Sequence, residues 1–273
     1  MIAFTGSKNV GLSIIAEAAK VQPGQRAIKH VIAEMGGKNA IIIDDTADLD
    51  EAVAGVVASF TGYQGQKCSA CSRAIVLGSI YEQFLQRVAD AVMSLQVGPP
   101  EDPGNRMGPM IDQRALEKVR EYIEIGKKEG RLVLERTIKG PGHFIGPAVF
   151  ADIKPTHRLA QEEIFGPVLA AMRAQNFEEA VRIANHSPYA LTGGLYSRSP
   201  ANVLTARTRF DVGNLYINRP ITGALVGRQP FGGHRLSGVG TKAGGEDYLK
   251  QFMLARVVSE NTLRRGFAPT ETE

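Results

Sequence analysis

Residues 33–43 read AEMGGKNAIII, the pattern of two strands joined by a tight turn. Residues 28–34 predict the first strand. Residues 40–43 predict the second, and they contain no polar side chain. A continuous apolar run of this length suits a strand that is buried on both faces, as in a parallel sheet. Shortly afterwards Asp48 can cap a helix, with Glu51 three residues later as in a capping box. The stretch therefore predicts sheet and helix in alternation.

The same alternation continues along the rest of the chain. We expect further strands at 1–5, 73–77, 131–135, 167–173, 191–196 and 212–217, and helices at 6–20, 79–95, 112–128, 176–185 and 200–209. This order predicts an α/β fold with a largely parallel sheet. The glycine-rich residues 219–245 predict a functional loop. Residues 252–258, FMLARVV, predict a last strand, and residues 264–273 predict a frayed polar tail.

Composition excludes several classes of protein. With 43% hydrophobic residues the chain has enough apolar side chains to fold, so we do not expect disorder. No apolar run has the length of a membrane span. The net charge of +4 is scattered along the chain, so we expect no nucleic acid partner. Two cysteines, and no pattern of a secretory signal, favour a cytoplasmic location.

Cys68 is a candidate nucleophile. It follows the small and polar residues GYQGQK, whose glycines leave backbone N–H groups free to face an oxyanion. Lys67 beside it could favour the thiolate. One alternative is an inert buried thiol. Another is a C-x-x-C redox or zinc pair with Cys71, although the chain has no second such pair and no histidine close by.

Glu34 is a candidate general base. It ends a predicted strand just before two glycines, which leave space for its carboxylate to reach a cleft. A partly desolvated glutamate has a raised pKa and can accept a proton near neutral pH. The alternative is an ordinary solvated acid at a strand end.

Two other segments predict contacts to a bound ligand. Gly6 and Ser7 lie where a strand meets a helix, and the free N–H groups of a helix N-terminus bind phosphate. Ser7 could equally be an ordinary N-cap. In EEIFGP (residues 162–167) Glu163 can accept ribose hydroxyls and Phe165 can pack on a flat ring. The alternative there is a helix end with a core Phe. The five histidines lack metal-ligand spacing, so we predict no metal site.

Taken together, these segments resemble the aldehyde dehydrogenase superfamily. They occur in the family's order and are FTGS at 4–7, AEMGGKN at 33–39, GQKC at 65–68, EEIFGP at 162–167, NLYINR at 214–219 and PFGG at 230–233. The resemblance runs from residue 2 to about residue 260. It covers only the C-terminal half of the family's chains, so we expect this chain to be a fragment. The asparagine that completes the family's oxyanion hole would precede it.

Within the family, GQKCSA (65–70) and TGALVG (222–227) resemble the branch that oxidises L-glutamate γ-semialdehyde, the 1-pyrroline-5-carboxylate dehydrogenases of proline degradation. The resemblance implies that the loop at 222–227 anchors the α-carboxylate and α-amino groups of the substrate, with the N–H groups of Gly223 and Ala224 and the hydroxyl of Ser69 as the donors. Phe231 would pack against its aliphatic part.

The mechanism that the resemblance implies is covalent. Cys68 attacks the aldehyde, a hydride passes to NAD, and Glu34 activates the water that hydrolyses the resulting thioester. The implied cofactor contacts are Gly6 and Ser7 on the pyrophosphate, Glu163 on the nicotinamide ribose and Phe165 near the nicotinamide.

The resemblance also implies an organisation of the chain. Residues 1–34 would be a remnant of a Rossmann-like NAD-binding domain, residues 35–245 the catalytic domain, and residues 246–273 an oligomerisation strand and tail. The implied assembly is a homo-oligomer joined through residues 252–258. Three alternatives stay open: a non-catalytic assembly partner, an aldehyde dehydrogenase of another substrate, and a thiol esterase that uses Cys68 and Glu34 without NAD.

Overall fold

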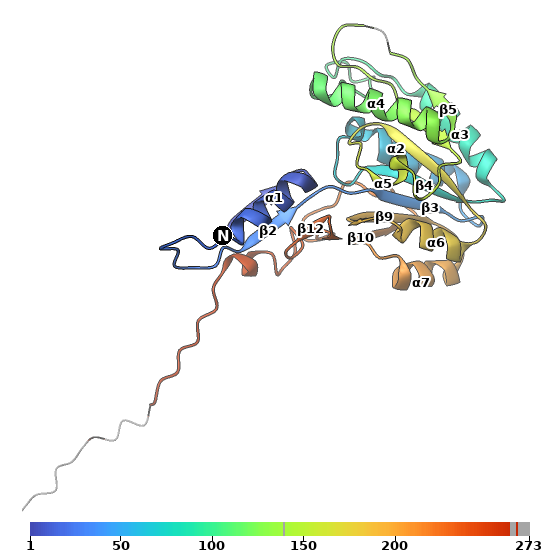
Figure 1. The fold of residues 1–273 in the computed structure, drawn as a ribbon. Coiled ribbons are helices and arrows are strands. Elements are labelled where there is room, and N and C mark those ends of the chain that lie inside the picture. Colours follow the sequence, from blue (N-terminus) through green and yellow to red (C-terminus); the bar gives the residue numbers. More distant parts are fainter. Residues whose placement is uncertain (139, 263–265, 267–273) are drawn as a thin grey trace, which may run out of the picture.

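The computed structural model describes residues 1–138, 140–262 and 266, which form a small part and a large part side by side (Figure 1). The small part is built on a three-stranded sheet with the order β1-β2-β12, in which β1 and β2 are parallel and β12 is antiparallel to β2. Its strands are β1 (Ile2–Thr5), β2 (Val31–Glu34) and β12 (Gly238–Val239), and α1 (Lys8–Ala18) connects the first two.

The large part is built on a seven-stranded sheet with the order β10-β9-β3-β4-β7-β6-β5. Neighbouring strands are parallel except for β5, which is antiparallel to β6. The strands are β3 (Asn39–Ile43), β4 (Cys71–Leu77), β5 (Arg131–Glu135), β6 (Ala148–Ala151), β7 (Val168–Ala174), β9 (Thr192–Tyr196) and β10 (Asn214–Ile217). A separate pair joins β8 (Tyr189–Ala190) to β11 (His234–Arg235).

Helices cover both faces of the large sheet. Successive side chains of a strand point to opposite faces of the sheet, so each strand contributes to both cores. In β3, Ile42 faces one core, and Ile41 and Ile43 face the other. One core is closed by α2 (Leu49–Thr61) and α3 (Tyr81–Ser94). The other is closed by α4 (Gln113–Glu129), α5 (Arg158–Gln161), α6 (Phe177–Asn185) and α7 (Pro200–Arg209). Burial on both faces explains the unbroken apolar run of β3.

The chain passes from the small sheet to the large one through the Gly-Gly turn. Strand β2 ends at Glu34, and β3 begins at Asn39. The carboxyl end of the small sheet therefore meets the amino end of the large sheet, and residues from both converge at this junction.

The predicted α/β fold with a mostly parallel sheet is confirmed. The predicted helix at 6–20 is shorter, because Ser7 is its N-cap, and the strand at 28–34 begins only at Val31. The structure adds β6, β8, β11, β12, α5 and two 3₁₀ turns, η1 (Gly62–Gly65) and η2 (Leu249–Phe252). Among the described helices, none has the length and apolar character to cross a membrane.

The predicted last strand at 252–258 does not form within the described chain. Residues 249–252 form η2, and residues 253–258 belong to no sheet. A strand needs a neighbour for its backbone N–H and C=O groups, and no described strand lies beside this segment. The domain boundaries stay a prediction, although β12 shows that residues 238–239 join the small sheet. Apart from Gly266, the predicted tail at 264–273 lies outside the described residues.

Candidate functional site

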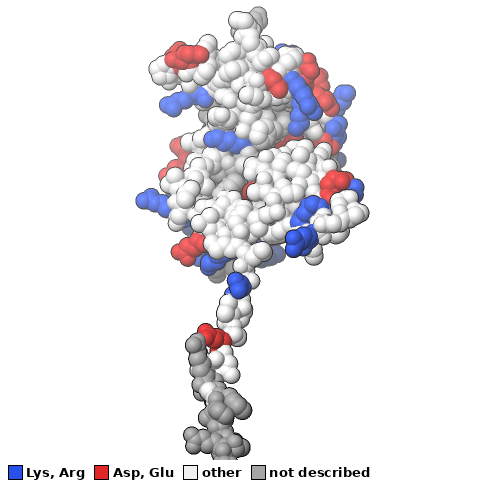
Figure 2. Space-filling model, turned by 90° about the vertical axis from the view of Figure 1, so that its left-hand side faces the viewer, with Lys and Arg blue, Asp and Glu red and all other residues white. Residues whose placement is uncertain are grey.

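A cavity of about 1050 Å³ lies where the two sheets meet. In Figure 2 the surface is hollowed at mid-height, between an upper and a lower part of the molecule. The junction of the small sheet, the Cys68 loop, the start of α4 and the turn at 163–165 all contribute to the lining. Its lining includes Gly6, Ser7, Glu34, Gly36, Cys68, Lys118, Glu163, Phe165, Phe231 and Ala243. Cys68 and Glu34 are thus brought together from separate elements.

The loop before Cys68 has an unusual backbone. Tyr63, Gln64 and Gly65 all have positive φ, so the chain reverses sharply after α2. At Gly65 a side chain would meet the carbonyl oxygen of Gly166 at 2.5 Å, so only glycine fits. The carbonyl of Cys68 then accepts a hydrogen bond of 2.7 Å from Nδ2 of Asn39, at the start of β3. The loop and this bond fix the position of the thiol at the cavity.

The surroundings of Cys68 favour the neutral thiol. Its side chain is partly buried, and burial raises its pKa; the nearby Glu163 and Glu34 carboxylates raise the pKa further. A hydrogen bond from the Ser69 backbone acts in the opposite direction. The expected influence of Lys67 is not found among these groups, and its ammonium lies 5.8 Å from the ring centre of Tyr63 instead.

The two cysteines occupy different environments. Cys68 lines the cavity, whereas Cys71 begins β4 with 1% of its surface exposed. Burial raises the pKa of the Cys71 thiol to about 12. Both are free thiols in the structure. Cys71 is therefore a core residue, and only Cys68 is available to a ligand in the cavity.

Glu34 has the properties of a base that works near neutral pH. Its main chain is held between Thr5 of β1 and Gly238 of β12. Burial raises its pKa from 4.5 to about 7, and the charge of Lys242 opposes this shift. Its Oε2 atom is buried and has no hydrogen-bond partner among the described residues. The carboxylate is consequently free to accept a proton from a molecule in the cavity.

Glu163 lies against the Gly-Gly turn. Its Oε1 accepts a hydrogen bond of 3.1 Å from the Gly37 backbone. A Cβ on Gly36 would lie only 2.1 Å from Oε2, so this glycine leaves the space that the carboxylate occupies. Burial raises the Glu163 pKa, and the cations Lys118 and Lys38 lower it. The arrangement holds an acceptor group at the cavity wall.

The other residues predicted to contact the cofactor, Gly6, Ser7 and Phe165, also line the cavity, but the N–H of Gly6 already has an acceptor. Ser7 caps α1, because its Oγ accepts from the Val10 backbone at 3.5 Å. The N–H of Gly6 donates to the carbonyl of Glu34 at 3.0 Å, so this N–H is already used. Phe165 has a φ of 62°, and 43% of its surface is exposed.

The predicted substrate contacts are divided between two places. Phe231 lines the cavity, and its backbone pairs with Ala243 through two hydrogen bonds of 2.8 and 2.7 Å. Ser69, Gly223 and Ala224 are not among the lining residues. Gly223 lies on an exposed loop with a φ of 80°, where even a Cβ would meet nothing within 4 Å. The substrate contacts of Ser69, Gly223 and Ala224 stay predictions.

Two residues of the site were missed by the sequence analysis. Asn39 lies within the AEMGGKN segment, which could have pointed to it, and it also accepts from the Thr192 backbone at 3.0 Å. Lys242 lies in the glycine-rich loop, where its position beside Glu34 depends entirely on how that loop folds back.

Comparisons with known proteins agree with the fold and the segments described above. The model of the "Aldehyde dehydrogenase family" matches residues 1–258. A 1-pyrroline-5-carboxylate dehydrogenase of Geobacillus sp. (strain WCH70) is 55% identical over 260 residues, which are 95% of this chain and 50% of the relative. The chain thus spans about half the length of the curated relatives that it matches.

Solved structures are also similar. A 1-pyrroline-5-carboxylate dehydrogenase from Thermus with bound NAD has a TM-score of 0.89 and 52% identity, over 92% of this chain and 48% of that one. Proline utilization A from Bdellovibrio bacteriovorus, inactivated by N-propargylglycine, has a TM-score of 0.95 and 53% identity, over 98% of this chain and 28% of that one.

Proposed function

This chain belongs to the aldehyde dehydrogenase family, and we propose that it carries the nucleophile and the base of an enzyme that oxidises L-glutamate γ-semialdehyde to L-glutamate with NAD. One observation above all supports this: Cys68 and Glu34 line the same cavity, and the pKa of Glu34 is raised to about 7. The names of the relatives support the substrate and the place in proline degradation.

In the first step the thiolate of Cys68 attacks the aldehyde carbon, and a C–S bond forms as the carbonyl oxygen becomes an alkoxide. The environment of Cys68 favours the neutral thiol, so its proton must leave first. Glu34 lies in the same cavity and, with a pKa of about 7, can accept that proton. When bound, NAD supplies the acceptor for the hydride that leaves the same carbon, and a thioester on Cys68 remains.

Before the second step Glu34 releases the thiol proton to solvent water. It then takes a proton from a second water molecule, and the resulting hydroxide attacks the thioester carbon. The C–S bond breaks, Cys68 leaves as thiolate and the carboxylic acid product is released. The raised pKa suits Glu34 to this step, because a base with a pKa near the working pH is partly ionised and basic enough to take the proton.

The residues present fit one end of a dinucleotide. The carboxylate of Glu163 fills the space that Gly36 leaves, and it can accept hydrogen bonds from ribose hydroxyls. Ser7 at the N-terminus of α1 would face the pyrophosphate together with Gly6, and the exposed Phe165 ring would pack near the nicotinamide. The relative from Thermus that was solved with NAD supports this assignment.

For the substrate, we propose that Ser69, Gly223 and Ala224 hold the α-carboxylate and α-amino groups, with Phe231 against the aliphatic part. Neutral donors suit a carboxylate in a closed pocket. The exposed loop at 223–227 would then have to close over the cavity when substrate binds.

Residues 253–258 are the candidate contact of a homo-oligomer. Leu254 and Val257 are 94% and 89% exposed, which is unusual for large apolar side chains. We propose that this segment forms its strand by pairing with a second copy of the chain. A non-catalytic assembly partner would use the same contact.

The test is NADH formation at 340 nm by the purified chain with NAD and glutamate semialdehyde. We expect a rate that Cys68→Ala abolishes, and a preference over butyraldehyde that Ala224→Asp removes, because a carboxylate there repels the substrate carboxylate. A folded chain without any rate would contradict activity of this chain alone. Hydrolysis of an activated ester that depends on Cys68 but not on NAD would instead support the esterase alternative.

A further inference from the structure

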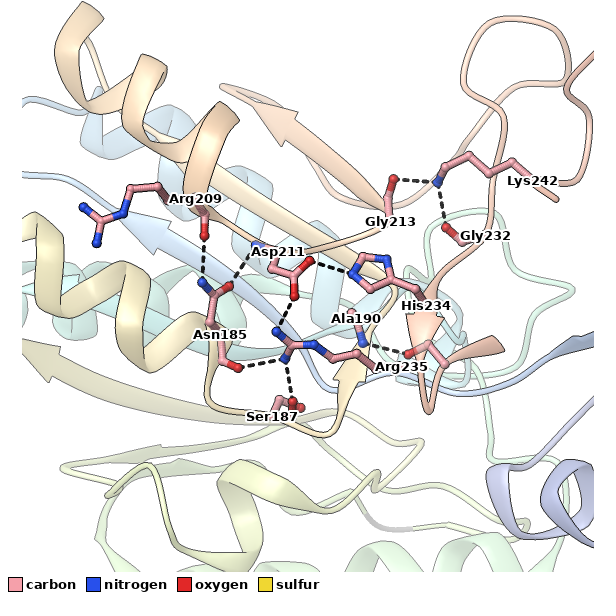
Figure 3. A network of polar contacts seen from close by, with 11 residues as sticks. Asn185, Ser187, Ala190, Arg209, Asp211, Gly213, Gly232, His234, Arg235 and Lys242 are labelled. Carbon is pink, nitrogen blue, oxygen red and sulfur yellow. Dashed lines mark hydrogen bonds and ion pairs between the residues drawn. The ribbon is translucent and has the colours of Figure 1, made fainter. Parts of the chain in front are cut away.

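Lys242 is held by three acceptors at the edge of the site. Its Nζ donates to the carbonyl oxygens of Gly213 and Gly232, at 2.5 and 2.7 Å (Figure 3). It also donates to Oδ1 of Asn214 at 2.9 Å. An ammonium group has three N–H donors, and these contacts use all of them. The three partners are neutral, so the positive charge is fixed in position without being cancelled.

Glu34 and Lys242 both lie against Gly232. A Cβ on Gly232 would lie 2.9 Å from Oε1 of Glu34 and 3.5 Å from Cγ of Lys242. The missing side chain therefore lets the two groups approach from different sides of one residue. No ion pair within 4 Å joins them among the described residues, so the charge of Lys242 acts on Glu34 across this glycine.

We propose that Lys242 is a positioning residue for Glu34. Its fixed charge keeps the Glu34 carboxylate ionised as the base, and its hydrogen bonds hold that charge beside the part of the cavity wall formed by Phe231 and Ala243. The proposal rests on the function proposed above. Lys242 is next to this wall in the chain. Ala243, the following residue, pairs with Phe231 by two backbone hydrogen bonds, and both residues line the cavity.

The electrostatic environment supports this role. Burial raises the pKa of Glu34, and Lys242 is the cation that lowers it. In return, burial lowers the Lys242 pKa and Glu34 raises it. The charge of Glu34 also raises the pKa of the Cys68 thiol. On the neighbouring strands, Thr5 and Gly238 pair with Glu34 and carry no charge. Lys118 and Glu163 line the cavity but are not among the groups that shift the Glu34 pKa.

The test compares Lys242→Gln, which keeps N–H donors without the charge, with Lys242→Arg, which keeps the charge. The matched control is Lys250→Gln, because Lys250 is exposed and pairs with Asp247. Glu34 is followed by ¹³C NMR of its carboxyl carbon, assigned through Glu34→Gln. We expect the titration midpoint to rise by about one pH unit in Lys242→Gln, and to stay near the native value in Lys242→Arg and Lys250→Gln. An unchanged midpoint in a folded Lys242→Gln protein would overturn the proposal.

A second measurement leaves Lys242 in place. In Glu34→Gln the titration of the Lys242 ammonium, followed by ¹⁵N NMR, should move to lower pH, because linkage between two charges is reciprocal. No movement would also overturn the proposal. Neither measurement needs turnover, so a shift without NADH formation would support the coupling while counting against the proposed function. If the protein is active, the pH profile of NADH formation by Lys242→Gln should shift to higher pH together with the Glu34 titration midpoint.

Discussion

Glu34 makes the stability of the folded protein depend on pH. Its folded-state pKa of about 7 lies above the ordinary value of 4.5, so between these values the folded chain binds the proton more tightly than the unfolded chain. The cost of burying the charge is absent below pH 4.5, grows as the pH rises and is complete above 7. Glu34→Gln should therefore be as stable as the native protein at pH 4.

At pH 8 the same substitution should raise the free energy of unfolding by about 1–2 kcal/mol, less than the full shift implies because solvent reaches the carboxylate in part. Urea unfolding at pH 4 and pH 8 measures this. Glu101→Gln is the control, since Glu101 lies on an exposed turn. A gain of equal size at both pH values would show that charge burial is not the cause.

A substitution at Gly36 tests whether the space beside this glycine positions the Glu163 carboxylate. In Gly36→Ala the new Cβ would lie 2.1 Å from the Glu163 carboxylate, so that side chain must move. We expect a loss of about 1–3 kcal/mol of stability and at least a tenfold rise in the KM for NAD. Gly62→Ala is the matched control, because a Cβ there meets nothing within 4 Å. If both variants bind NAD alike by calorimetry, Glu163 does not hold the cofactor.

At the scale of elements, residues 253–258 show why a strand pattern and a strand can differ. The apolar, β-branched residues favour extended backbone, but pairing depends on a neighbour. We expect the chain to form a dimer or larger assembly in solution, and Leu254→Asp to shift it toward the monomer. Light scattering after size-exclusion chromatography measures the mass. The control is Met93→Asp on α3, because the Met93 side chain is exposed as well, at 56%. A native protein that is monomeric at 100 µM would refute the proposal.

At the scale of the whole molecule, apolar surface is concentrated on the small part. Strand β1 is at the edge of its sheet, and Val10 and Val21 are 50% and 68% exposed. Much of the lower surface in Figure 2 carries no charged side chain. Such a surface promotes association. Val10→Lys should lower the binding of a hydrophobic dye about twofold, and Leu204→Lys on α7 should lower it less. Equal reductions would show that the small part is not special.

The layered α/β fold can be predicted from the sequence, because buried strands and amphipathic helices have hydrophobic periods that can be counted. The sequence also pointed to Cys68 and Glu34, since their flanking glycines are local features. Three features of the site depend on tertiary contacts: the Glu34 pKa near neutrality, the position of Lys242 close to Glu34 and the burial of Cys71 in the core. Burial and charge at one residue come from segments up to 208 positions away, such as Lys242 from Glu34. No local pattern encodes such a distance, because it depends on how loops close between elements.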